Sequence, residues 1–320
     1  MRKQTIGGSL KDRILSCGFY ILFILVAVVY TCMAPAFLTA ENIVSILNAA
    51  TFSLFAAAGT SLVFISGNMD MSIGSIALVA AAALTLGSKA GLPVSAVILL
   101  TILVGALIGL VNGILAAYGR MNSMLTTLGL MLAYRGIGLQ ITGGRQITLA
   151  SEYKNFARIK IMGIPVWVVL SLLAVVIVQI VLKKTRFGAY CYALGCSESA
   201  AKKVGIPVRK VKIAVFVISG ICAAVTGLIV ASRLGVMRST IGSGMEFDIV
   251  AAIVIGGVSL QGGRGSVLPG TFLGVLLLKV IDNGLAMVGA SPYAYRFVEG
   301  MIIFAAMYMD SLRSLRKKSA

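Results

Sequence analysis

One acidic residue stands among apolar neighbours and is the first candidate for chemistry. Asp70 is the only charged residue between Glu41 and Lys89, and it lies in the stretch SGNMDMSIGS between two apolar runs. A carboxylate at the centre of a membrane costs about 2.5–3.5 kcal/mol, so it needs a polar partner or water. Two interpretations are open: Asp70 caps the start of the following helix, or it lines a path for a polar solute.

A few further polar residues also lie in apolar stretches. Arg135 is one of them, and Lys279 and Asp282 have the i,i+3 spacing that permits a mutual ion pair on one helix face. Ionisable groups inside a membrane are rare and are functional by default. We expect a translocation path lined by Asn68, Asp70, Ser72, Asn112, Arg135 and Asn283.

The residue sets that most enzymes use are missing from the sequence. It contains no histidine, its five cysteines form no CxxC pair, and neither GxxxxGKS nor GxxxxGKT occurs. No nucleophile with an adjacent base, no metal-ligand cluster and no ATP site can be assembled from what remains. We therefore expect no catalytic residue, no cofactor and no metal on this chain.

Glycines indicate where helices break and where they pack closely. Gly105, Gly109 and Gly113 are spaced by four residues, which is typical of close contact between membrane helices. Other glycines accompany two polar breaks, one around Asp70 and one before Ser266. At these breaks we expect hinges at Gly67, Gly74, Gly256, Gly257, Gly262 and Gly263.

The composition places these residues in a membrane protein. Of the 320 residues, 59% are hydrophobic and 12% are charged, whereas soluble domains are about 45–50% apolar and about 25% charged. The net charge of +18 would suit nucleic-acid binding only if the basic residues formed one face, which such apolar helices do not allow. Positively charged loops on one side of a membrane explain the charge better.

Apolar stretches of about 20 residues predict the membrane-spanning helices. The chain is expected to be an all-α integral membrane protein with one transmembrane domain, residues 1–320, and about ten spans. Short or broken helices are expected near 67–88 and 247–266, where small residues are frequent. The predicted spans are 17–35, 43–66, 71–88, 93–117, 122–141, 163–182, 211–231, 247–260, 266–288 and 295–311.

The distribution of Lys and Arg predicts the orientation. With ten spans and the N-terminus inside, the inside segments hold 17 basic residues and the outside segments hold seven. This asymmetry favours a multi-pass protein with both termini in the cytoplasm. The cytoplasmic parts are then residues 1–16, the loop 183–210 and the tail 312–320.

The loop 183–210 has the signature of a short surface helix. Ser197 is suited to the N-cap, Glu198 to the first turn, and Lys202 and Lys203 to the C-terminal end, while Gly205 ends the helix. Taken alone, a helix of one to two turns is compatible with a solvated connector.

Three segments resemble the permease subunits of bacterial ABC importers for ribose and related sugars. Their order and spacing match that family from about residue 35 to residue 311. The sequence departs from the family pattern at Asn68, Met69, Cys196, Lys279 and Asp282. The matching segments are SGNMDMSIGSI, YALGCSESAAKKVGIPVRKVK and IVAAIVIGGVSLQGGRGSVLPGTFLGVLLLKVIDNGLAMVGASPYAY.

The resemblance implies partners that supply energy and substrate. It implies a separate ATP-binding cassette subunit at the inner face of the bacterial cytoplasmic membrane, an external solute-binding protein, and a second permease copy or sister permease. Lipid surrounds the assembly. The short cytoplasmic helix would then transmit movement from the ATPase through Ser197, Glu198, Ser199, Ala200, Ala201, Lys202, Lys203 and Gly205.

Two functions follow from these observations. The first is a permease subunit that forms the path for a monosaccharide while another chain hydrolyses ATP. The alternative is an ion- or proton-coupled secondary transporter that uses Asp70, Asp282 or Glu299. Sugar uptake that survives a proton uncoupler but not ATP depletion favours the first.

Overall fold

The computed structural model describes residues 10–119 and 121–318, so residues 1–9 and 319–320 of the predicted cytoplasmic termini lie outside the described part. The long helices are α1 (Leu10–Met33), α2 (Ala40–Ile65), α3 (Ile73–Lys89), α4 (Val94–Tyr118), α5 (Ser123–Thr142), α7 (Val166–Lys184), α10 (Val208–Leu234), α12 (Phe272–Met287) and α13 (Pro292–Lys318). The short helical elements are α6 (Ser151–Ala157), α8 (Arg186–Cys196), α9 (Glu198–Lys203), α11 (Met245–Ile255) and the π-helical turn η1 (Val267–Thr271). Two antiparallel pairs of two-residue strands join β1 (Ile147–Thr148) to β4 (Val236–Met237) and β2 (Lys160–Ile161) to β3 (Ile164–Pro165).

The all-α prediction is confirmed, and a helix occupies each of the ten predicted stretches. Six helices of the described part are long and apolar enough to cross a membrane. Two others are short where short helices were predicted: α3 has 17 residues and α11 has 11, or about 17 Å at 1.5 Å per residue. The number of about ten crossings is therefore not confirmed and stays a prediction.

The centre of the bundle is α10, which packs against α2, α3 and α4. The approach of α4 to α10 is close because Gly105, Gly109 and Gly113 face it. A Cβ added to Gly113 would lie 2.8 Å from the Cα of Ile213, nearer than real Cβ atoms come. The spacing of these glycines thus correctly predicts a helix contact.

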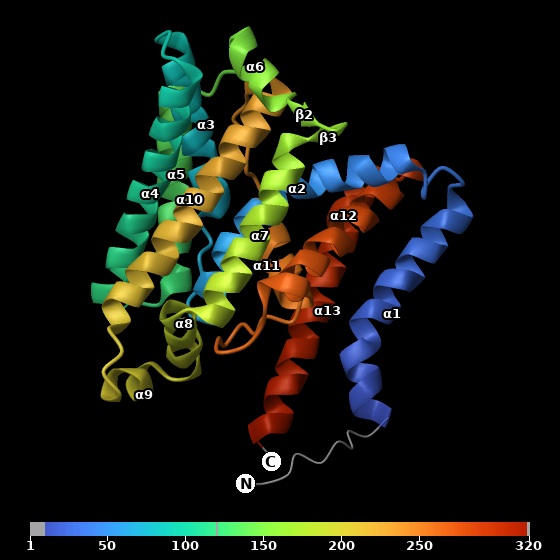
Figure 1. Ribbon diagram of the computed structural model, residues 1–320, viewed down its shortest axis with the longest axis vertical. Coiled ribbons are helices and arrows are strands. Elements are labelled where there is room, and N and C mark those ends of the chain that lie inside the picture. The colour runs from blue at the N-terminus through green and yellow to red at the C-terminus, as the bar shows by residue number, and fades with distance from the viewer. Residues whose placement is uncertain (1–9, 120, 319–320) are drawn as a thin grey trace.

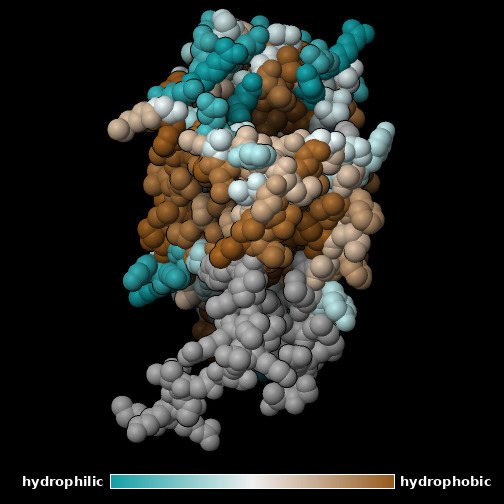
Figure 2. Space-filling view, turned by 90° about the vertical axis from the view of Figure 1, so that its right-hand side faces the viewer, coloured by the Kyte–Doolittle hydropathy of each residue, from teal (hydrophilic) through white to brown (hydrophobic). Residues whose placement is uncertain are grey.

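The outward faces of the helices are apolar. On α4, Leu99, Leu103, Leu107 and Ile114 are 43–60% exposed, on the side away from the glycines that contact α10. Figure 2 shows a hydrophobic band across the middle of the molecule and hydrophilic residues at its upper end. This arrangement suits helices surrounded by lipid.

The two ends of the bundle carry different elements. The helix α6 and the strands β2 and β3 lie at one end, while α8 and α9 lie at the other (Figure 1). The start of α1 and the end of α13 lie at the same end as α8 and α9 (Figure 1). The predicted loop 183–210 and both ends of the described chain therefore share one side.

Candidate functional site

The helix α2 ends in a segment without regular structure, residues 66–72, which is buried except at Gly67 and Met69. Gly67 has a φ of 76°, a left-handed conformation that glycine adopts without strain, and this turns the chain away from α2. The N–H and C=O groups of non-helical backbone at membrane depth need hydrogen-bond partners from other parts of the protein. Two side chains of α5 do so: Ser123 Oγ accepts a hydrogen bond from the Met69 N–H and Thr127 Oγ1 accepts one from the Met71 N–H, each at 3.0 Å.

Asp70 is fully buried at the centre of this break. Its Oδ1 accepts hydrogen bonds from the N–H and the hydroxyl of Ser72, at 2.9 and 2.6 Å, and its Oδ2 accepts one from the Ser219 hydroxyl on α10 at 3.1 Å. Within the described part of the chain, no Lys or Arg forms an ion pair with it. The capping interpretation is therefore only partly right, because Asp70 binds the N–H of Ser72, which itself occupies the N-cap position of α3.

The network around Asp70 continues into α4 and α5. The Asn112 amide donates to Ser72 Oγ at 2.8 Å, and the Tyr134 hydroxyl donates to Asn112 Oδ1 at 2.9 Å. All of these side chains are buried. The network thus joins the break to three helices, α4, α5 and α10.

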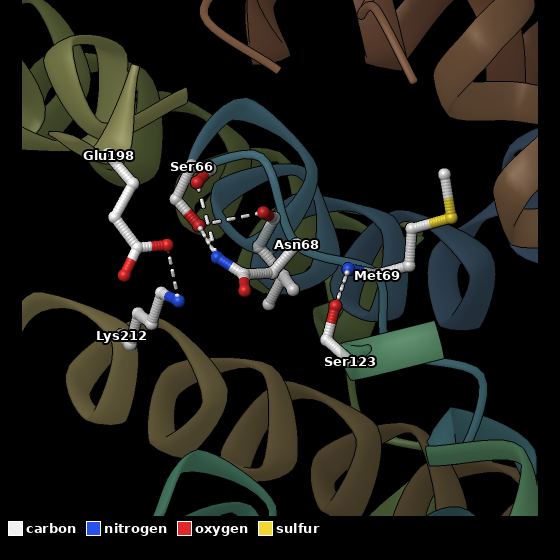
Figure 3. A network of polar contacts seen from close by, with 7 residues as sticks. Ser66, Asn68, Met69, Ser123, Glu198 and Lys212 are labelled. Atoms are coloured by element: carbon white, nitrogen blue, oxygen red, sulfur yellow. Dashed lines mark hydrogen bonds and ion pairs between the residues drawn. The ribbon is translucent and has the colours of Figure 1, made fainter. Parts of the chain in front are cut away.

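The structure brings together three of the six residues predicted for the translocation path: Asp70, Ser72 and Asn112. Asn68 is buried nearby, but its amide donates to the carbonyl and hydroxyl oxygens of Ser66, as Figure 3 shows. The other two lie apart from the network. Arg135 Nη1 donates to the Ser239 carbonyl at 3.4 Å.

Asn283 forms a reciprocal amide pair with Asn42 of α2, with both hydrogen bonds at 2.9 Å. On the same helix, the Lys279 ammonium contacts Asp282 at 2.8 Å, so the ion pair predicted from their spacing is confirmed. These contacts link α12 to α2 and neutralise two charges within α12.

Sequence reasoning missed Tyr134, Ser219 and Glu246. Glu246, at the start of α11, is 5% exposed, and its Oε2 has no hydrogen-bond partner in the described part of the chain. A Cβ on Gly74 would lie 2.6 Å from that oxygen, so the glycine admits the carboxyl group. A tyrosine or a serine inside an apolar stretch is ordinary, and no spacing signal singled these residues out.

The short helix predicted in the loop 183–210 is α9, and its cap is as expected. Ser197 Oγ accepts a hydrogen bond from the Ala200 N–H at 3.3 Å. Glu198 forms an ion pair with Lys212 of α10 at 2.8 Å, and Figure 3 shows the two side chains facing one another. Ala201 is buried, whereas Ser199, Ala200, Lys202, Lys203 and Gly205 are exposed.

The helix α8 lies where the end of α2 meets the loop 256–266, which follows α11. The Tyr192 hydroxyl donates to the Gly265 carbonyl at 2.8 Å, and the Gly263 N–H donates to the Ile65 carbonyl at the end of α2, also at 2.8 Å. A Cβ on Gly262 would lie 2.5 Å from the Gly67 Cα. Three of the predicted hinge glycines, Gly67, Gly262 and Gly263, thus lie in this contact.

The other three predicted hinge glycines have different surroundings. Gly74 lies inside the first turn of α3 against Gly242, and Gly256 ends α11 against the Gly270 carbonyl. Gly257 has a φ of 86° and open space beside it.

The arrangement connects a surface helix to a buried polar break. Within the described residues, no group of His, Cys, Asp or Glu is placed to hold a metal ion. A continuous chain of contacts runs through these elements. The helix α8 contacts the loop 256–266, and that loop contacts the end of α2. The break that follows α2, residues 66–72, is hydrogen-bonded to α5.

Comparison with known proteins identifies the family. The family described as "Branched-chain amino acid transport system / permease component" matches residues 42–307, and the chain belongs to it. The ribose import permease protein RbsC of Bacillus subtilis is 37% identical over 306 residues, which cover 95% of this chain and 92% of the relative. RbsC of Haemophilus influenzae is 35% identical over 305 residues, 94% of each chain. The galactose/methyl galactoside import permease protein MglC of Salmonella typhimurium is 32% identical over 321 residues, 94% of this chain and 95% of the relative. No solved structure matches the chain.

Proposed function

We propose that this chain is the membrane-spanning permease subunit of an ATP-binding-cassette importer for a monosaccharide such as ribose or a galactoside. The observation that carries the proposal is similarity over nearly the full length to permeases named for ribose and galactoside import. ATP hydrolysis then occurs on a separate subunit, since the sequence contains no phosphate-binding loop of the Walker type. The relatives give no support to the alternative of an ion-coupled secondary transporter.

The helix α9 is the part of the chain best suited to contact the ATPase subunit. Its exposed face combines two lysines with the apolar Val204, which is 76% exposed just beyond the helix. The Glu198–Lys212 ion pair joins α9 to α10, so a displacement of α9 by the ATPase subunit would be transmitted to a membrane helix. The contacts of α8 with the loop 256–266 provide a second route to the break at Asp70.

The break at residues 66–72 is proposed to line the sugar path, with α5 bound to it. Ser123 and Thr127 bind the backbone of the break, so α5 and the break are expected to move together. On the outward side of α5, a Cβ on Gly129 or Gly136 would meet nothing within 4 Å. A helix face with such small residues is suited to close approach by a second permease copy.

The proposed topology places both termini, α8 and α9 in the cytoplasm, with about ten helices crossing the bacterial inner membrane. The excess of basic residues in segments 1–16, 183–210 and 312–320 supports this orientation. The end with α6 then faces the solute-binding protein.

Reconstitution tests the proposal. The permease is placed in vesicles with its ATPase subunit, and sugar-loaded binding protein is added at the opposite face. We expect labelled ribose or methyl galactoside to accumulate only when ATP, the ATPase and the binding protein are all present. Accumulation by the permease alone would contradict the proposal.

A further inference from the structure

A basic cavity lies at the end of the bundle opposite α8 and α9. It has a volume of about 160 Å³ and is formed where the ends of α6 and α10 meet the start of α7. A water molecule fills about 30 Å³ of liquid, so the cavity has room for a larger group. Its walls include Arg158, Lys160 and Arg233.

Among the described residues, no carboxylate forms an ion pair with the three cations in this cavity. Within the described part of the chain, the ion pairs join Lys212 to Glu198 and Lys279 to Asp282, and neither reaches the cavity. The guanidinium of Arg233 donates one hydrogen bond, from Nη1 to the Asn48 carbonyl at 2.6 Å, which leaves most of its N–H groups for another acceptor. Asn48 itself lines the same cavity.

A buried hydrogen-bond donor in the same wall also lacks an acceptor. Trp167, the only tryptophan of the chain, is 7% exposed and lines the cavity. Its ring packs edge-on against Phe156 with the centroids 5.0 Å apart, yet its indole N–H finds no hydrogen-bond partner in the part of the chain that the structure describes. A buried indole N–H normally finds an acceptor. The indole nitrogen has less than 1 Å² of accessible surface, so Trp167 is a reporter at the cavity wall and not a ligand.

The hairpin beside the cavity presents apolar side chains outward. Ile161, Met162 and Ile164 are 51%, 96% and 44% exposed, and Ile159 next to them is 47% exposed. In Figure 1 this hairpin projects from the bundle near α6. Basic residues interleaved with exposed apolar residues, beside a tryptophan, are typical of the headgroup level of a membrane.

From these features together we infer that the cavity binds the phosphate of an anionic phospholipid. The phosphodiester would accept hydrogen bonds from Arg158, Lys160 and Arg233, while the hairpin enters the apolar layer of the same leaflet. The orientation proposed above makes this the outer leaflet, but binding does not depend on that orientation. A hairpin that presents isoleucine and methionine side chains can enter the apolar layer while the neighbouring cations stay at the headgroups, and this combination favours a lipid over an acidic partner protein.

The single tryptophan allows a direct test. The full-length permease is reconstituted in phosphatidylcholine vesicles that contain increasing fractions of brominated phosphatidylglycerol, and quenching of the Trp167 fluorescence is followed. Brominated phosphatidylcholine serves as the reference lipid. We expect half-maximal quenching at a mole fraction at least fivefold lower for phosphatidylglycerol. In the Arg158→Gln/Lys160→Gln variant this advantage should disappear, because each Lys or Arg near the surface contributes about 1 kcal/mol, or roughly fivefold, to the binding of an anionic lipid.

A matched control and the opposing outcomes complete the test. Arg145→Gln removes one exposed cation outside the cavity wall and should retain the wild-type quenching. Equal quenching by both brominated lipids, or an unchanged advantage in the double variant, overturns the inference. Inorganic phosphate at about 10 mM exceeds the dissociation constant of a millimolar site. If it displaces phosphatidylglycerol fully, the cavity is reassigned to free phosphate. Loss of solute-binding-protein affinity in the double variant, with lipid quenching intact, reassigns it to protein docking.

Discussion

Replacing Asp70 by asparagine removes a buried negative charge and leaves a side chain of nearly the same size. An asparagine Oδ1 keeps both hydrogen bonds from Ser72, whereas its Nδ2 faces the Ser219 hydroxyl, which must then accept. Ser219 has a second hydroxyl neighbour, Thr60 Oγ1 at 3.4 Å, toward which its proton can turn. The hydrogen-bond pattern therefore survives the substitution.

Two opposing terms decide the effect of this substitution on stability. Hydrogen bonds to a charged group contribute about 1.5–3 kcal/mol and neutral ones about 0.5–1.5 kcal/mol, so three weakened bonds lose about 3 kcal/mol. A buried ion without a counter-ion carries a penalty of several kcal/mol, which the neutral amide avoids. The terms are of similar size, and the free energy of unfolding of Asp70→Asn is expected to stay within about 2 kcal/mol of wild type.

Transport should respond more strongly than stability. The carboxylate is fully buried in this conformation, and a conformation that admits water to the break would solvate it. The charge therefore favours opening, and its removal favours the closed state. A bias of about 1.4–3 kcal/mol corresponds to a 10- to 100-fold shift in that equilibrium, so sugar uptake should fall at least about tenfold.

Uptake of labelled ribose and methyl galactoside by cells that express the complete importer measures this effect, with thermal melting of the purified permease in parallel. Ser219→Ala keeps the charge and removes one hydrogen bond, so it should reduce uptake by only about twofold. Normal uptake by Asp70→Asn at normal expression would refute the reasoning. An equal loss in Ser219→Ala would show that the hydrogen bond matters and the charge does not.

Three further tests concern the connections between the helices. Reversing the charges of both Glu198 and Lys202 should uncouple ATP hydrolysis from uptake without unfolding the protein, since an exposed ion pair contributes only about 0–1 kcal/mol. Restoring the pair by Lys212→Glu in that background should recover part of the uptake. Gly262→Ala should lower the free energy of unfolding by about 1–3 kcal/mol and sugar uptake by about tenfold. The new Cβ would force the loop 256–266 away from Gly67 in the segment 66–72. Thr127→Val leaves a buried backbone N–H of the break without its acceptor, which should lower the free energy of unfolding by about 1–3 kcal/mol in thermal melts.

The Gly262 and Thr127 predictions each have a matched control. Gly289→Ala introduces a side chain at a φ of 70° with nothing within 4 Å, so it tests the backbone strain without the clash. Thr126→Val removes a hydroxyl from an exposed hydrogen bond at the start of α5 and should change the melting little. Equal effects in a variant and its control would contradict the contacts assigned to Gly262 or Thr127. Coupled hydrolysis in the charge-reversed α9 would contradict its role.

Helix positions could be predicted from the sequence because an apolar run is a local signal. The same holds for the cap of α9, where Ser197 and Glu198 are adjacent in the chain, and for the Lys279–Asp282 pair within one helix turn. The helix α8 was not predicted, because its aromatic and glycine-containing sequence in a basic loop has no clear period. Its stability depends on contacts with a loop some 70 residues away, such as the bond from Tyr192 to Gly265.

The candidate site could be predicted only in part, for the same reason. Asp70 was recognisable because a lone carboxylate in an apolar stretch is rare. Its partner Ser219 lies 149 residues further along the chain, and the two meet only because α10 packs beside the break. Asn283 looked equally suited to a polar path, but it pairs with Asn42, 241 residues away. Side-chain partnership across helices depends on how the helices rotate against one another, and no local pattern reports that rotation.

The source of energy for uptake is the most direct test of the central claim that this chain is the permease of an ATP-driven sugar importer. Cells that express the permease with its ATPase and solute-binding protein are given labelled ribose or methyl galactoside, either with a proton uncoupler at maintained ATP or with ATP depleted. We predict that uptake continues with the uncoupler and stops when ATP is depleted. Uptake that stops with the uncoupler while ATP remains high would contradict the account and favour an ion-coupled transporter.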